Sequence, residues 1–139
     1  MSYHFVATTS LGLEAVLAQE LRSMGVGVDA TGRGVVYFVG KLESGDRACL
    51  WSRIASRVFL RVARGRVDSP DAIYALANSV NWSDHLGVDQ TLLVDFVGQG
   101  RGISNSVFGA QRVKDAIVDD LREEDGRRPD VDFDNPDVR

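Results

Sequence analysis

A glycine-rich segment, Gly98-Gln99-Gly100-Arg101-Gly102, is the part of the sequence whose residue types most suggest chemistry. It follows a predicted strand and precedes a predicted helix, as a nucleotide or S-adenosylmethionine site requires. Small residues let the backbone approach a ligand, and the amides at a helix N-terminus bind anions. Only 37 residues follow Gly102, however, and a cofactor-binding doubly wound sheet needs several further strands. A turn is the better interpretation, and we expect no cofactor in this segment.

Basic and amide side chains gather around this glycine segment and the start of the helix after it. Such donors, together with backbone amides, suit a phosphate or a carboxylate. A second basic stretch, residues 53–66, holds five arginines and no acidic residue. Ordinary exposed arginines that form surface ion pairs would give the same pattern. The candidate phosphate-binding residues are Arg53, Arg57, Arg101, Asn105, Ser106, Arg112 and Lys114.

The other reactive residue types form no catalytic or metal-binding pattern. Cys49, His4 and His85 are scattered without zinc-ligand spacing, and Cys49 is interpreted as a small core residue of a helix. The segment Asp134-Asn135-Pro136-Asp137 resembles the Asn-Pro-Pro-Tyr motif of amino-methyltransferases, but it lacks the second proline and the aromatic residue. We interpret it as a loop turn. The sequence thus predicts no catalytic residue and no metal ligand.

Composition and charge narrow the class of protein. The 139 residues are 44% hydrophobic and 26% charged, which is ordinary for a folded soluble protein. The net charge of −4 argues against indiscriminate binding of nucleic acid. Residues 119–139 hold nine acidic and four basic residues, so that residues 1–118 carry +1. The chain has a single cysteine, and its sequence shows neither an apolar stretch long enough to span a bilayer nor a secretory signal. We therefore expect a cytoplasmic protein without a membrane partner.

The first half of the chain predicts two helices among four strands. The expected elements are a strand at 5–8, a turn at 9–12 that can cap a helix, a helix from Leu13 to Met24, a hairpin of strands 26–31 and 35–39, a helix at 44–52 capped by Ser44, and a strand at 58–67. The order β-α-β-β-α-β is that of a ferredoxin-like subdomain on one antiparallel sheet. The predicted fold class is therefore α+β.

The second half predicts two helices and one strand. The expected elements are a helix from Ser69-Pro70 to about Val80, a strand at 91–97, and a long helix that Ser104 or Asn105 caps and that ends near Glu124. Arg112, Asp115 and Asp119 are expected on the side of that helix opposite its apolar face. The strand has too few partners, so we expect a truncated fragment.

Several segments resemble the THUMP-containing RNA methyltransferases. The opening residues Phe5-Val6-Ala7-Thr8-Thr9 and Gly12-Leu13-Glu14 are shared widely among them. More specific segments are Leu50-Trp51-Ser52-Arg53 and Gly109-Ala110 with Val113-Lys114-Asp115-Ala116-Ile117-Val118-Asp119. In these segments the chain is similar to the bacterial large-subunit ribosomal RNA guanine-N2 methyltransferases of the long bifunctional kind.

The resemblance implies a ferredoxin-like subdomain at 1–67 and an α/β THUMP domain at 68–139 that lacks its final strands. It also implies a downstream Rossmann-like domain, absent from this chain, that uses S-adenosylmethionine to methylate 23S ribosomal RNA. The segment itself would hold the RNA and would not be catalytic alone. Two alternatives remain: a self-sufficient S-adenosylmethionine enzyme built on residues 98–102, and a ferredoxin-like protein-interaction module without an RNA role.

Overall fold

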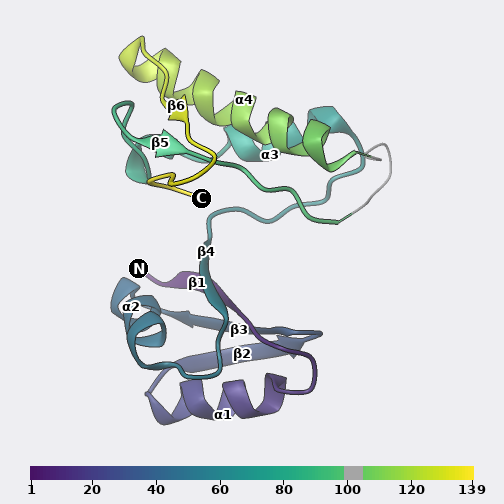
Figure 1. The fold of residues 1–139 in the computed structure, drawn as a ribbon, viewed down its shortest axis with the longest axis vertical. Helices are drawn as coiled ribbons and strands as arrows, with labels where there is room; N and C mark the ends of the chain where they lie inside the picture. The colour runs from purple at the N-terminus through teal and green to yellow at the C-terminus, as the bar shows by residue number, and fades with distance from the viewer. Residues whose placement is uncertain (99–104) are drawn as a thin grey trace. The chain divides into compact units, whose positions relative to one another are not determined.

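The computed structural model describes residues 1–98 and 105–139, which divide into two compact units (Figure 1). The first unit is Met1–Val62 and the second unit is Ala63–Arg139. No helix among the described residues is both long enough and apolar enough to cross a membrane.

The first unit is a four-stranded antiparallel sheet with two helices. Its elements are β1 (Tyr3–Thr8), α1 (Glu14–Ser23), β2 (Gly27–Gly32), β3 (Val35–Gly40), α2 (Leu42–Trp51) and β4 (Arg57–Arg61). The strand order is β2-β3-β1-β4, which places the two central strands β1 and β3 side by side. The predicted ferredoxin-like β-α-β-β-α-β order is confirmed, and with it the α+β class.

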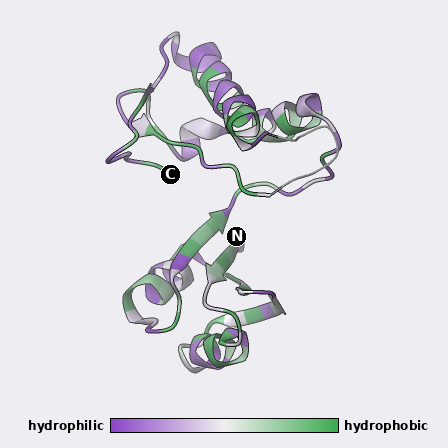
Figure 2. Ribbon diagram, turned by 45° about the vertical axis from the view of Figure 1, so that its right-hand side comes forward, coloured by the Kyte–Doolittle hydropathy of each residue, from purple (hydrophilic) through white to green (hydrophobic). Residues whose placement is uncertain are grey.

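The core of the first unit lies between the helices and one face of the sheet. Phe5 of β1 and Phe38 of β3 are paired in register, and their rings stack with centroids 4.9 Å apart. Leu17 and Leu21 of α1 are fully buried against this pair. Helix α2 comes close because Gly45 has no side chain; an added Cβ there would overlap the Phe5 ring. Figure 2 shows the predominantly hydrophobic strands that supply this layer.

Three expected boundaries in the first unit are wrong. Helix α2 begins at Leu42 after Lys41, so Ser44 lies inside the helix and caps nothing. Leu13 precedes α1 without a side-chain cap, and the carboxylate of Glu14 instead accepts the Gly12 and Gly34 amides at 2.9 and 2.8 Å. Strand β4 ends at Arg61, which pairs with His4 of β1, well short of the predicted end at residue 67.

The second unit packs two helices beside a small parallel sheet. Its elements are α3 (Pro70–Asn78), the 3₁₀ helix η1 (Trp82–Asp84), β5 (Thr91–Leu92), α4 (Ser106–Asp125) and β6 (Asp130–Val131). Ser69 caps α3 as expected, since its hydroxyl accepts the Ala72 amide at 3.1 Å. Leu86 and Leu92 pack with Ile117 and Leu121 of α4 in a separate core. Hydrophobic and hydrophilic positions alternate around α4 (Figure 2).

Strand β5 departs from the expectation in length and in partners. Only Thr91 and Leu92 are in a strand, although the apolar run predicted one over 91–97. The pairing partners of β5 are short. The two-residue strand β6 pairs with it in parallel, and Val138 adds one parallel bridge at Leu92. The strand thus has partners in the last ten residues, but they are few, as predicted.

Carboxylates tie the second unit together. Asp120 of α4 accepts the Trp82 amide at 3.0 Å, which fixes η1 to the helix. Asp137 accepts both the amide and the hydroxyl of Thr91, at 2.8 and 3.2 Å, which fixes the last residues to β5. These two aspartates therefore have a structural role inside the second unit.

Candidate nucleic-acid interface

Helix α4 positions most of the side chains that the sequence singled out. Its N-cap is Asn105, whose Oδ1 accepts the Val107 amide at 2.9 Å, so one of the two expected caps is confirmed. Its C-cap is Gly126, which takes the left-handed conformation at φ 73° and turns the chain back along the helix. The helix has 20 residues, a length of about 30 Å at 1.5 Å per residue.

The start of α4 carries two of the predicted phosphate ligands. Asn105 and Ser106 are both exposed, and the first turn contains no acidic residue. The positive end of the helix dipole is therefore not neutralised by a side chain of that turn. Arg101 lies outside the described residues.

Arg112 points away from any phosphate site, toward α3. Its guanidinium pairs with Asp71 at 3.3 Å and lies over the Tyr74 ring, 4.8 Å from the centroid. The side chain is 27% exposed, and its Nε is buried without a hydrogen-bond partner among the described residues. The expectation that Arg112 lies on the outward side of α4 is wrong, because the aromatic face of Tyr74 and the Asp71 carboxylate draw it into the contact between the helices.

Asp119 also faces α3 and not the solvent side. Its carboxylate accepts the Tyr74 hydroxyl at 2.5 Å. This hydrogen bond raises the pKa of Tyr74 above its ordinary value, and partial burial and the charges of Asp119 and Glu123 act in the same direction. The Asp119 carboxylate therefore has a partner on α3.

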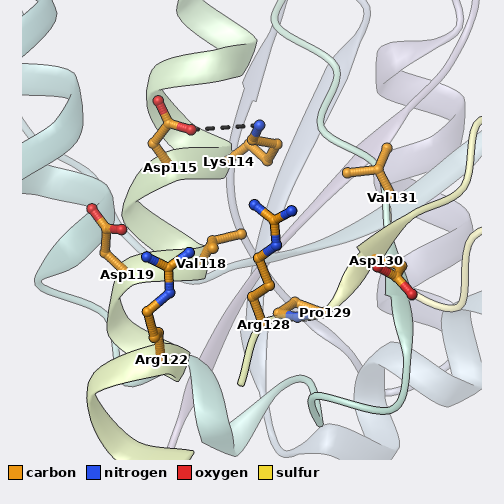
Figure 3. Close-up of a pocket in the computed structure, with 9 residues that line it drawn as sticks. All are labelled: Lys114, Asp115, Val118, Asp119, Arg122, Arg128, Pro129, Asp130 and Val131. Carbon is orange, nitrogen blue, oxygen red and sulfur yellow. Dashed lines mark ion pairs between the residues drawn. The ribbon is translucent and has the colours of Figure 1, made fainter. Parts of the chain in front are cut away.

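Lys114 lies on another side of α4, where it lines a pocket with two arginines that the sequence analysis did not select. Arg122 is eight residues farther along the helix, and Arg128 comes from the segment that returns after Gly126. Figure 3 shows Arg128 extending toward Lys114 beside Val118. The pocket has a volume of about 330 Å³. We call Lys114, Arg122 and Arg128 the basic pocket.

The lining of the basic pocket also holds three acidic residues, Asp115, Asp119 and Asp130, as many as its basic residues. Lys114 pairs with Asp115 at 3.5 Å, and both side chains are more than a third exposed, so the pair is weak. Asp119 already accepts from Tyr74, and Asp130 is the third acidic residue of the lining. Arg122 and Arg128 form no ion pair with any residue that the structure describes. Their guanidinium groups therefore remain available to an anion.

Comparison with known proteins assigns both units. The THUMP domain profile matches residues 67–139, which is more than half of the chain. The chain belongs to the THUMP family. The profile described as the RlmL ferredoxin-like domain matches residues 4–59, within the first unit. We therefore call the second unit the THUMP unit and the first unit the ferredoxin-like unit.

Relatives of the chain are large-subunit ribosomal RNA methyltransferases. The protein named ribosomal RNA large subunit methyltransferase K/L of Pseudomonas paraeruginosa is 47% identical over 137 residues, 99% of this chain and 19% of that protein. Its namesake from Pseudoalteromonas atlantica is 45% identical over 99% of this chain and 20% of its own length. The chain thus spans about a fifth of these relatives, at their N-terminal part. The resemblance noted from the sequence is confirmed.

A solved structure from Listeria monocytogenes, described as a predicted N6-adenine-specific DNA methylase, has the same fold. It superposes with a TM-score of 0.84 at 30% identity and covers 91% of this chain, and this chain covers 33% of it.

Two signals could have led from the sequence to the basic pocket. Lys114, Val118 and Arg122 follow one another at four-residue spacing, which places them on one side of a helix. Gly126 marks the helix end, and the buried Pro129 shows where the chain packs back against α4 and brings Arg128 with it. Of the three, Lys114 alone lies close in sequence to the other predicted ligands around the glycine segment.

The remaining predicted residues lie elsewhere in the fold. Arg53 and Arg57 are exposed in the ferredoxin-like unit, Arg53 between α2 and β4 and Arg57 at the start of β4. Cys49 is an exposed free cysteine, so its expected core position is wrong. Among residues 1–98 and 105–139 no group of histidine, cysteine or acidic side chains could hold a metal ion.

The segment 134–137 is a loop turn, as expected. Asp132 accepts the Asp134 and Asn135 amides at 3.0 and 3.1 Å. These two hydrogen bonds lower the pKa of Asp132 below its ordinary value.

Proposed function

We propose that the chain is the RNA-binding N-terminal segment of a 23S ribosomal RNA guanine-N2 methyltransferase. In this proposal the THUMP unit holds ribosomal RNA so that a downstream domain of the same polypeptide can transfer a methyl group from S-adenosylmethionine. The observation that carries the proposal is the basic pocket, three cations from two segments on one side of α4, in a member of the THUMP family. The proposed limits are 1–67 for the ferredoxin-like subdomain and 68–139 for THUMP.

Electrostatic attraction to the phosphate backbone is the proposed source of affinity. Arg122 and Arg128 can each donate two parallel hydrogen bonds to a phosphate, and Lys114 adds a point charge. Interactions of this kind position RNA without reading its bases, which suits recognition of a folded hairpin by shape. Asn105 and Ser106 at the start of α4 would add amide donors to a neighbouring phosphate.

The described residues do not fit S-adenosylmethionine. A cofactor site of the doubly wound type needs a parallel sheet of several strands, whereas the parallel sheet described here consists of β5 and β6, two residues each, and the Val138 bridge. We therefore assign methyl transfer to the downstream domain and derive no catalytic step for this segment.

The test is a titration of the chain with a fluorescently labelled 23S ribosomal RNA hairpin, followed by anisotropy at about 0.1 M salt. The variant Lys114→Ala/Arg122→Ala/Arg128→Ala should bind at least tenfold more weakly. Its salt slope should fall by about one for each phosphate group that the variant no longer neutralises.

A matched control is Arg127→Ala. Arg127 precedes Arg128 but already pairs with Asp89 and Asp125 at 3.2 and 3.4 Å. This variant should bind as the unchanged chain does. If the triple variant and the control both retained full affinity, the basic pocket would not be the RNA site. If the unchanged chain bound no hairpin, the protein-interaction alternative would be favoured.

A further inference from the structure

The ferredoxin-like unit has a sheet face that its helices leave uncovered. Residues alternate along each strand, and Phe5, Ala7, Val36 and Phe38 point into the core. Their neighbours therefore point to the opposite face. Register aligns these neighbours in rows across β4, β1, β3 and β2: Arg61–His4–Val39–Gly27, Phe59–Val6–Tyr37–Ala30 and Arg57–Thr8–Val35–Gly32. We call these twelve positions the open face.

Two aromatic rings occupy the middle row of the open face. Phe59 on β4 and Tyr37 on β3 flank Val6, which pairs with both. Adjacent strands are about 4.8 Å apart, so the two aromatic residues are about 10 Å apart across the sheet. Phe59 is 42% exposed although it is a large apolar side chain in the middle of a strand. Part of the Phe59 ring is therefore accessible to a ligand.

The Tyr37 ring lies beside Gly32 of β2. A Cβ added at Gly32 would come within 3.5 Å of Tyr37 Cε2 and 2.9 Å of Val35 Cγ2. The phenol ring therefore leans from β3 over the backbone of β2. A ring held against the sheet in this way loses little rotamer freedom when a ligand stacks on it.

Arg57 and Arg61 are the charged residues among the twelve positions of the open face, and Asp29, at the bulge of β2 between Val28 and Ala30, is not one of these positions. Arg57 and Arg61 lie on either side of Phe59 along β4, with His4 beside Arg61 in register. None of the twelve positions is acidic, in a chain that holds more acidic than basic residues. Bases stack on aromatic rings while arginines follow the phosphates between them, and this combination binds single-stranded nucleic acid with little sequence preference.

We infer that the open face binds unpaired RNA, with bases stacked on Phe59 and Tyr37 and the backbone held by Arg57 and Arg61. This site is in the ferredoxin-like unit and is separate from the basic pocket proposed for the THUMP unit. Ribosomal RNA hairpins contain both kinds of element, since a loop of unpaired bases closes a paired stem. A protein partner is disfavoured because two arginines and a histidine border the aromatic row on the face.

The test uses the whole 139-residue chain and a labelled ten-nucleotide oligouridine, which forms no stem. Phe59→Leu keeps an apolar side chain but removes the ring, and it should weaken binding roughly fivefold or more. Phe59→Tyr restores a ring and should bind within about twofold of the unchanged chain. Arg57→Gln/Arg61→Gln should lower the salt slope by about one to two.

Trp51→Ala is the matched control, since Trp51 is a 70% exposed aromatic residue on α2, a helix packed on the core side of the sheet. It should leave oligouridine binding unchanged. The inference is overturned if Phe59→Leu binds as tightly as the unchanged chain, if Trp51→Ala weakens binding equally, or if oligouridine does not bind. If the open face fails this test but the hairpin still binds through the basic pocket, the proposed function stands. If oligouridine binds through the open face but the basic-pocket variant keeps full hairpin affinity, only the assignment of the pocket is removed.

Discussion

The two units carry opposite charge and are stabilised in different ways. The ferredoxin-like unit has five acidic and seven basic residues, and its core is a continuous apolar layer between sheet and helices. The THUMP unit has fifteen acidic and nine basic residues, and carboxylates bridge its segments. Asp119, Asp120 and Asp137 each accept a hydrogen bond from a residue more than 35 positions away.

This difference shows why net charge is a poor guide to where this protein binds RNA. In the THUMP unit three of the aspartates accept internal hydrogen bonds, whereas Arg122 and Arg128 of the basic pocket have no ion-pair partner among the described residues. In the ferredoxin-like unit the twelve positions of the open face include the basic residues of β4 and no acidic residue. A protein of negative net charge can therefore present two local groups of basic side chains, Arg122 with Arg128 and Arg57 with Arg61, that are not held in ion pairs with its described acidic residues.

The largest expected effect is on the apolar core of the ferredoxin-like unit. Phe38→Ala removes a fully buried ring that stacks on Phe5, and it should lower the free energy of unfolding by about 3–5 kcal/mol. Urea unfolding followed by circular dichroism measures this. A loss below about 1 kcal/mol would mean that the stacked pair does not hold this unit together.

A glycine of α4 should give the next largest effect. Helix propensity alone predicts that Gly109→Ala stabilises α4 by about 1 kcal/mol. The structure predicts the opposite sign, because the added Cβ would lie 2.8 Å from the Phe96 ring. We expect a net destabilisation of about 1–2 kcal/mol, measured by thermal unfolding. A rise in the melting temperature would show that Phe96 moves aside freely.

The carboxylate bridges of the THUMP unit can be tested at Asp120. Asp120→Ala leaves the partly buried Trp82 amide without its partner and should cost about 1–2 kcal/mol. Hydrogen exchange should show the loss at Trp82 and η1, with the ferredoxin-like unit unaffected. Glu124→Ala is the control, since Glu124 is an exposed acidic residue of the same helix whose side chain bonds to no other described residue. Equal effects of the two variants would contradict a specific bridge.

The smallest effect is a pH dependence in the ferredoxin-like unit. The Gly34 and Gly12 amides hold the pKa of Glu14 below its ordinary value. A carboxyl whose pKa is lowered by folding contributes stability above its unfolded pKa and loses it as the pH falls through the folded pKa. Glu14→Gln should therefore melt at a lower temperature than the unchanged chain at pH 7, and the gap should narrow below pH 4.5, the ordinary value. A gap that is constant with pH would rule out this role.

The order of elements was predictable from the sequence, but the lengths of the strands were not. Alternating apolar residues and glycine turns predict the order of elements in the ferredoxin-like unit, although the predicted strand 58–67 ends at Arg61. The run at 91–97 is equally apolar, yet only two of its residues form a strand, because β6 and Val138 offer so little edge to pair with. Which strands pair depends on the tertiary structure, and the spacing of apolar residues along the sequence does not reveal it.

The candidate site was predictable only in part, for a similar reason. Asn105 could be predicted as a cap because its side chain bonds to the Val107 amide of the same helix, a local interaction. Arg112 was misplaced because its partners, Asp71 and Tyr74, come from another helix. Arg128 was missed because it reaches the pocket through the reversal at Gly126.

The most direct test of the two-surface account is ultraviolet crosslinking of the chain to a 23S ribosomal RNA hairpin, with the attached residues located by mass spectrometry. We predict crosslinks at Lys114 or its neighbours in the basic pocket and at Phe59 or Tyr37 on the open face, and none at the exposed Trp51 or Phe133. Crosslinks concentrated at Trp51 and Phe133, with none at the two surfaces, would contradict the account.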